Sequence, residues 1–153
     1  FLRDAGEVGA SGLLLTDLPA GSDPAVEQAV RESSLDLIRL VAPTCTGARL
    51  NAVVRDAQGF LYLVARLGVT GASAALATGL EEYIARVRAA SPLPLAVGFG
   101  ISTPAQARTV AGLADGVVVG SALVDKLGKD GPVAAGQFLA ELRAALDAAG
   151  RSA

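Results

Sequence analysis

Residues 93–121 read LPLAVGFGISTPAQARTVAGLADGVVVGS, and this stretch decides the fold. Two apolar runs, 93–98 and 115–120, flank a segment, 104–113, whose apolar residues recur at helical spacing. Each run passes into a loop rich in glycine. Strands that are apolar on both faces belong to parallel sheets, in which a helix connects each strand to the next. The stretch therefore predicts a strand–helix–strand unit.

The same alternation runs through the rest of the 153 residues. Further apolar runs predict strands at 12–17, 35–42 and 60–65. Amphipathic segments predict helices at 23–33, 46–56, 80–90 and 132–149, with a short helix at 122–127. A strict alternation of strands and helices is typical of the α/β class.

Two of these helices begin with capping residues. Ser22-Asp23-Pro24 is followed by Glu27, and Ser102-Thr103-Pro104 is followed by Gln106. A side chain that accepts from the first free N–H groups, with proline at the start, is the usual signature of a helix N-terminus. We therefore expect helices to begin at both places.

Composition removes several classes of function. A chain with 52% hydrophobic and 18% charged residues folds into a globular domain, and its formal net charge of −2 offers no basic surface to nucleic acid. Apolar runs too short for a bilayer, and no secretory pattern, favour a cytoplasmic protein without a membrane partner. With no histidine and one cysteine, Cys45, a Ser-His-Asp triad, a zinc cluster and an intrachain disulfide are excluded. We expect no metal site and assign Cys45 no role.

The loops favour one of two architectures. A dinucleotide-binding sheet has G-x-G-x-x-G after its first strand, and here that loop reads TDLPAGSDP. The glycines instead follow the last two strands, as Gly98-Phe99-Gly100 and Gly120-Ser121. Phosphate sites of (β/α)8 TIM barrels lie after the last two strands, where N–H groups and a helix N-terminus favour an anion. We expect such a site, although glycines that only permit tight turns would give the same pattern.

One loop, 67–79 (LGVTGASAALATG), is long and rich in Gly, Ala and Ser. This composition is typical of a lid over a site, and a tolerated surface loop explains it equally well. Five strands are fewer than the eight that a barrel of roughly 250 residues requires. We therefore expect 1–153 to be a fragment that forms a single partial barrel domain, from about the third helix through the eighth.

An ordered set of short motifs runs through the chain. They are Thr16-Asp17-Leu18-Pro19, Ala42-Pro43-Thr44, Gly59-Phe60-Leu61-Tyr62, Gly68-Val69-Thr70-Gly71, Gly98-Phe99-Gly100-Ile101-Ser102 and Ala114-Asp115-Gly116-Val117-Val118-Val119-Gly120-Ser121. With them the sequence resembles the tryptophan synthase alpha subunit family over nearly its whole length. The resemblance implies a TIM-barrel lyase of tryptophan biosynthesis, which cleaves indole-3-glycerol phosphate to indole and glyceraldehyde 3-phosphate in a retro-aldol reaction.

The resemblance also implies which residues contact this substrate. The implied donors to its phosphate are Gly71, Gly100, Gly120 and Ser121. Tyr62 and Phe99 would line the indole pocket, although an aromatic residue in a buried strand is otherwise a core residue. Thr70 would support catalysis from the lid, by bonding the catalytic aspartate when the lid closes.

The family's acid and base are two carboxylates of the second strand and the loop after it. We expect both to be absent here, so that the 153 residues alone are inactive. Asp17 would hold a loop or the partner interface, and Asp115 would be structural. The implied partner is the beta subunit, in an alpha2beta2 complex. The resemblance implies that pyridoxal phosphate is carried by that subunit. Lys126 and Lys129 of this chain do not suit a Schiff base, and we expect no cofactor in this chain.

Two alternatives stay open. A sugar-phosphate isomerase or epimerase of another barrel family would share the loops after the last two strands but would not predict the G-V-T-G motif. A noncatalytic interaction fragment would use its exposed strand edges to pair with another chain.

Overall fold

The computed structural model describes residues 1–65, 73–98 and 100–149, with the backbone alone for 73–78. Within these residues helices and strands alternate along the chain. They are α1 (Leu2–Glu7), β1 (Gly12–Leu14), α2 (Pro24–Arg31), β2 (Asp36–Val41), α3 (Gly47–Arg55), β3 (Leu61–Val64), α4 (Ser73–Ala90), β4 (Leu95–Gly98), α5 (Pro104–Ala111), β5 (Gly116–Val118) and α6 (Ser121–Ala148). Each predicted strand is found, and each is shorter than predicted.

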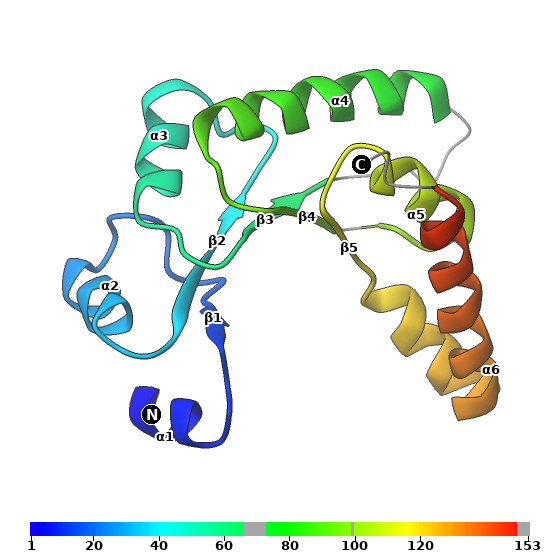
Figure 1. Cartoon of the computed structure of the whole chain (residues 1–153), viewed down its shortest axis with the longest axis horizontal. Coiled ribbons are helices and arrows are strands. Elements are labelled where there is room, and N and C mark those ends of the chain that lie inside the picture. Colours follow the sequence, from blue (N-terminus) through cyan, green and yellow to red (C-terminus); the bar gives the residue numbers. More distant parts are fainter. Residues whose placement is uncertain (66–72, 99, 150–153) are drawn as a thin grey trace.

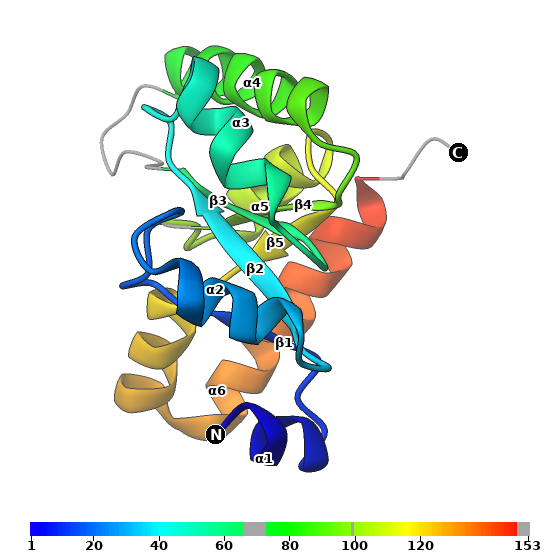
Figure 2. The same cartoon turned by 90° about the vertical axis from the view of Figure 1, so that its left-hand side faces the viewer.

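The strands form one five-stranded sheet in the order β1-β2-β3-β4-β5, with every neighbouring pair parallel. The sheet is curved, and α2 to α6 lie around its outer side (Figure 1). Figure 2, turned by 90° from Figure 1, shows the same helices alongside the sheet. This is the α/β architecture of a partial (β/α)8 barrel, as the sequence predicts.

The two faces of the sheet differ in burial although both are apolar. Side chains of the outer face, such as Val41, Leu61 and Val97, are 0% exposed because the helices cover them. Residues of the concave face, among them Ile38 and Tyr62, are only half-buried. The barrel architecture explains why both faces are apolar: helices cover the outer face of each strand, and the other face points into the barrel interior.

Both predicted helix caps are present. The Asp23 side chain accepts a hydrogen bond from Val26 N at 3.1 Å, with proline at the start of α2. Thr103 and Gln106 form a complete capping box at the start of α5. These two caps fix where the chain leaves the loops after β1 and β4.

The predicted loop 67–79 is wrong in its second half, because α4 begins at Ser73 and not at Leu80. Residues 73–79 (SAALATG) contain three alanines and a leucine, the strongest helix formers, and these outweigh the glycine at the end of the segment. The long helix predicted at 132–149 and the short one at 122–127 are merged into α6, which is interrupted at Gly131, where φ is 82°. α6 therefore consists of two helical segments.

Candidate functional site

The carboxyl ends of β4 and β5 bring the two glycine-rich loops together. Gly98 and Val118 are partners in the parallel ladder, so Gly100 and Gly120 each lie two residues beyond the same rung. Gly100 is exposed and has φ 86°, a left-handed conformation that favours glycine. The predicted phosphate donors Gly100, Gly120 and Ser121 are thus placed at one edge of the sheet.

The helices that follow these loops differ at their N-termini. In α5, Gln106 Oε1 accepts from Ser102 N at 2.8 Å and Thr103 N at 3.2 Å, so the chain itself uses these N–H groups. In α6, the N-cap is Gly120, and no side-chain cap hydrogen bond is present there. The positive end of a helix dipole with free N–H groups binds anions. Within the described residues, the two helix starts thus differ: Gln106 occupies N–H groups at the start of α5, whereas no side chain caps α6.

Gly120 also leaves room for a ligand. A Cβ built on Gly120 would have no heavy atom within 4 Å apart from its own chain neighbours and the helix backbone. Within the described residues, packing therefore does not require glycine at this position.

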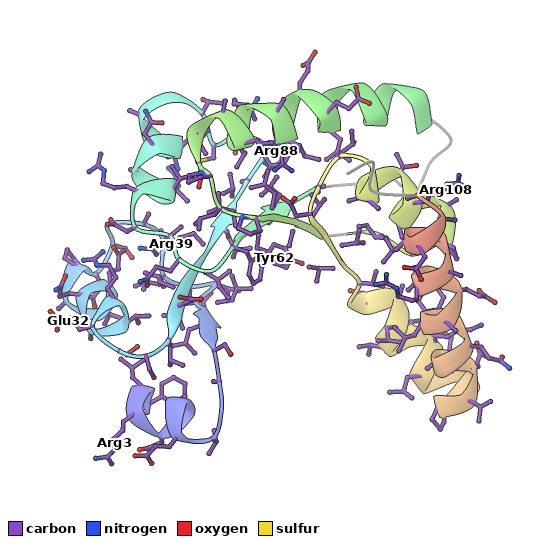
Figure 3. All side chains as sticks on the ribbon, in the orientation of Figure 1. Arg3, Glu32, Arg39, Tyr62, Arg88 and Arg108 are labelled. Carbon is purple, nitrogen blue, oxygen red and sulfur yellow. The ribbon has the colours of Figure 1, made fainter. Side chains whose placement is uncertain are left out.

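Tyr62 lies in the middle of β3 with its side chain on the concave face of the sheet (Figure 3). The hydroxyl end of its phenol lies over Gly98, so that a Cβ built there would meet Tyr62 Oη first and the ring Cζ at 2.7 Å. Tyr62 thus lies near the loop that follows β4. Three other predicted site residues, Thr70, Gly71 and Phe99, lie outside the described residues.

Side chains of α4 hold the loop after β2. The Tyr83 hydroxyl donates to Val41 O at 2.6 Å, and Arg86 donates to Pro43 O at 2.8 Å. The Arg86 guanidinium also lies 5.4 Å from the centre of the Tyr83 ring. Burial raises the pKa of the Tyr83 phenol well above its usual range, so the hydroxyl stays a donor. The sequence predicts neither of these contacts, because both residues lie in a segment that is predicted only as an amphipathic helix.

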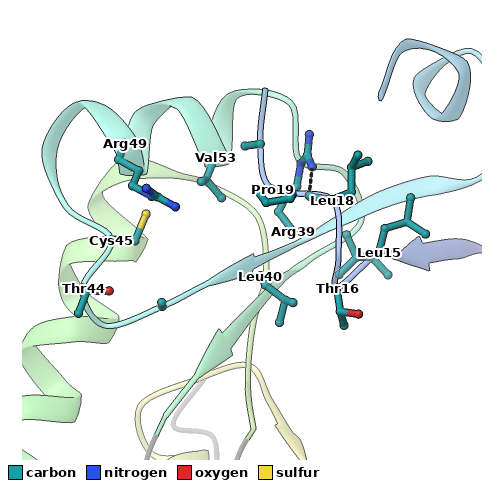
Figure 4. Close-up of a pocket in the computed structure, with 13 residues that line it drawn as sticks. Leu15, Thr16, Leu18, Pro19, Arg39, Leu40, Thr44, Cys45, Arg49 and Val53 are labelled. Atoms are coloured by element: carbon teal, nitrogen blue, oxygen red, sulfur yellow. Dashed lines mark hydrogen bonds between the residues drawn. The ribbon is translucent and has the colours of Figure 1, made fainter. Parts of the chain in front are cut away.

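The loop between β1 and α2 borders a cavity of about 390 Å³ on the same edge of the sheet (Figure 4). Leu18 and Pro19 of the loop and Arg39 of β2 line it, with Arg49 and Val53 of α3 on the far side. Asp17 is exposed on this loop. Its place agrees with a role in the loop or in a partner interface, which stays a prediction.

Asp115 lies at the opposite edge of the sheet. It accepts from Leu95 N at 2.9 Å and pairs with Arg88 at 3.1 Å, which ties the amino ends of β4 and β5 together. Such contacts at the amino edge of barrel strands serve stability. Asp115 is therefore structural, as the sequence indicates.

Both lysines form exposed ion pairs within α6. Lys126 pairs with Asp130 at 2.8 Å and Lys129 with Asp125 at 2.7 Å, and the hydrogen bond to each aspartate raises the pKa of its lysine. A Schiff-base lysine needs a lowered pKa.

The described residues contain neither a metal-binding cluster nor a membrane-spanning helix. No group of three His, Cys, Asp or Glu side chains there could hold a metal ion. No helix in the described part of the chain combines the length and apolarity needed to cross a membrane.

Comparison with known proteins gives one consistent result. The family described as "Tryptophan synthase alpha chain" matches residues 1–148. The alpha chain of Novosphingobium aromaticivorans is 45% identical over 100% of this chain and 57% of its own length. That of Dehalococcoides mccartyi is 42% identical over 96% of this chain and 58% of its own. The chain thus spans little more than half the length of these curated relatives.

Solved structures agree in fold. The alpha subunit of Legionella pneumophila tryptophan synthase is 36% identical with a TM-score of 0.82, over 96% of this chain and 56% of the other. A Mycobacterium tuberculosis tryptophan synthase structure is 40% identical with a TM-score of 0.83, over 95% of this chain and 55% of the other. The partial barrel described above therefore matches a portion of these larger chains.

Proposed function

Because the chain belongs to the tryptophan synthase alpha chain family, we propose that it works in tryptophan biosynthesis, as the part of the subunit that holds the substrate phosphate. The reaction is the retro-aldol cleavage of indole-3-glycerol phosphate. A general acid protonates the indole ring at C3, and a base removes the proton of the adjacent glycerol hydroxyl. The bond between C3 and the hydroxyl-bearing carbon breaks, and indole and glyceraldehyde 3-phosphate are released.

One observation carries the phosphate assignment. The N-terminus of α6 lies at the carboxyl edge of the sheet, beside the loop after the neighbouring strand β4, and among the described residues no side chain caps it or fills the space at Gly120. Backbone N–H groups of Gly120 and Ser121 would donate to the phosphate, with Gly100 on the adjacent loop. Gly71 is proposed as a fourth donor, by resemblance alone.

The indole ring would lie deeper in the barrel. Tyr62 is half-buried on the concave face next to Gly98, so its ring is placed to contact a substrate whose phosphate sits above the ends of β4 and β5. Phe99 would complete this pocket, and Thr70 would support catalysis. The acid and the base are proposed to be carboxylates outside the 153 residues.

The proposed partner is the beta subunit, in an alpha2beta2 complex that holds pyridoxal phosphate outside this chain. The raised pKa values of both lysines support a chain without this cofactor. The family match favours the lyase over the sugar-phosphate isomerase or epimerase, which the two glycine-rich loops would also suit, and over a noncatalytic interaction fragment.

A pair of glycine substitutions in α6 of the full protein tests the phosphate assignment. Gly120→Ala adds a methyl group where the phosphate would approach, and Gly128→Ala adds one on the same helix, where a Cβ also has open space. Loss of one hydrogen bond to a charged group is expected to raise KM for indole-3-glycerol phosphate about tenfold in Gly120→Ala. Gly128→Ala should leave KM unchanged. Equal KM values in Gly120→Ala, Gly120→Val and the parent would disprove the assignment.

A further inference from the structure

Two opposite charges are buried beneath the loop that follows β1. Arg39 lies on the outer face of β2, between Leu37 and Val41, and is 4% exposed. Glu27 of α2 packs onto that face and is also 4% exposed. Arg39 Nη2 lies 2.8 Å from Glu27 Oε2. The two side chains thus form an ion pair in a layer that is otherwise apolar.

The same two side chains reach the loop backbone at two points. Arg39 Nη1 donates to Leu18 O at 3.2 Å, and Gly21 N donates to Glu27 Oε1 at 2.7 Å. Both contacts lie within residues 15–23, which connect β1 to α2. The ion pair therefore joins β2, α2 and both halves of this loop in one network.

A third charged group supports Glu27 from the surface. Arg31 Nη1 lies 4.0 Å from Glu27 Oε2 and 3.4 Å from Asp56 Oδ1, beyond the end of α3. The network thus extends from the loop to α3.

Stability alone does not account for this arrangement. Burying two charges costs several kcal/mol for each ion, and well-packed apolar residues at such positions are often as stable or more so. Among the described residues neither Arg39 Nε nor Nη2 has a partner with hydrogen-bond geometry, although Nη2 lies 2.8 Å from Glu27 Oε2, so the pair is not an optimal one. Two leucines would fill the same layer but would offer neither a donor to Leu18 O nor an acceptor to Gly21 N. The charged pair therefore contributes something that two leucines would not, because it fixes the position of the loop.

The loop lies where position matters. It follows β1 at the carboxyl edge of the sheet, the same edge at which Gly100 and Gly120 lie. Thr16 and Asp17 are exposed on it, and Leu18 and Pro19 border the cavity of Figure 4. A displacement of Leu18 or Gly21 would move all four residues relative to β2.

We propose that Glu27 and Arg39 are positioning residues, which set the β1–α2 loop at the rim of the active site. The pair holds the loop from beneath and does not contact the substrate. The effect on catalysis rests on the proposed function, whereas the effect on the loop does not.

The test replaces both charges at once. Glu27→Leu/Arg39→Leu leaves no unpaired buried charge, so the full protein should keep its unfolding midpoint. The amide of Gly21 loses its acceptor, and its hydrogen exchange should become about tenfold faster. The control, Arg143→Leu/Asp147→Leu, removes an exposed ion pair of α6 and should leave Gly21 exchange unchanged. Arg39→Lys keeps the charge without the planar fork and should give an intermediate rate.

A second readout links the loop to catalysis. In the double leucine variant, kcat/KM for indole release should fall on the order of tenfold, because a displaced rim misplaces the reacting groups. Unchanged Gly21 exchange would overturn the proposal, as would unchanged kcat/KM in a variant whose loop has loosened. A parent protein that releases no indole would contradict the proposed function instead, and the exchange of Gly21 would still decide whether the pair positions the loop.

Discussion

Replacing Gly98 with alanine places a methyl group between β4 and the ring of Tyr62. The new Cβ would clash most closely with Tyr62 Oη, and would lie 2.7 Å from Tyr62 Cζ and 3.0 Å from Val118 Cβ. Ordinary contacts between carbon atoms are 3.5–4.0 Å, so the ring would have to move by about 1 Å. Overpacking of this kind costs about 1–3 kcal/mol of unfolding free energy.

Urea unfolding of the full protein measures this cost. With an m-value of about 2 kcal/mol per molar urea, a loss of about 2 kcal/mol lowers the midpoint by about 1 M. Gly116→Ala is the matched control, because its Cβ would meet Ala96 Cβ at 3.5 Å, an ordinary contact. That substitution, in the neighbouring strand on the same face, should leave the midpoint unchanged or raise it.

A double-mutant cycle assigns the cost to the ring. In a Tyr62→Ala background the clash with the Tyr62 side chain is gone and, of the three contacts, only that with Val118 Cβ at 3.0 Å remains, so Gly98→Ala should cost less than in the parent. A Gly98→Ala variant as stable as Gly116→Ala would refute the reasoning. So would a cost of equal size with and without the Tyr62 ring, since that would remove Tyr62 from its position over Gly98.

Three further outcomes are expected. Produced alone, the 153 residues should release no indole above background, because loss of the proton-transfer groups forfeits on the order of 10²- to 10⁴-fold for each; activity near that of a complete subunit would contradict this. The same chain should self-associate through the edges of β1 and β5, which have a partner on one side only in the described sheet, and light scattering from a monodisperse monomer over a wide concentration range would argue against it. Tyr83→Phe should lower the unfolding free energy by about 1–2 kcal/mol, because Val41 O loses its donor inside the core, and calorimetry that finds no change would show that water replaces the hydroxyl.

The sequence predicts the fold well because apolar runs and capping residues are local signals. The capping box at Thr103 and the cap at Asp23 each need only a few neighbouring residues, and both are found where predicted. Strand ends were predicted less well. Residues 16 and 17 end the strand predicted at 12–17, because they directly follow its apolar run. In the structure they lie in a turn after β1, in which Leu18 N donates to Leu15 O at 3.3 Å. Such a turn depends on the loop that follows, which periodicity does not describe.

The sequence alone does not predict contacts between residues that are far apart along the chain. Glu27 was predicted only as part of a helix start, and its real partners are Gly21 N and Arg39. The signal that could have found the pair is an arginine inside the apolar run LDLIRLVA, since a buried strand position that holds a charge needs a counter-ion. The packing of Tyr62 over Gly98 likewise needs the register of β3 against β4, which no single strand reveals.

The most direct test of the central claim is a titration of the full protein with inorganic phosphate, followed by amide chemical shifts. Saturable shifts are expected at Gly120, Ser121 and Gly100, which lie at one edge of the sheet. The amides of Ser102 and Thr103, which already donate to Gln106, should not saturate with phosphate. Shifts confined to Ser102 and Thr103, or no shift at Gly120 and Ser121, would contradict the assignment of the phosphate site.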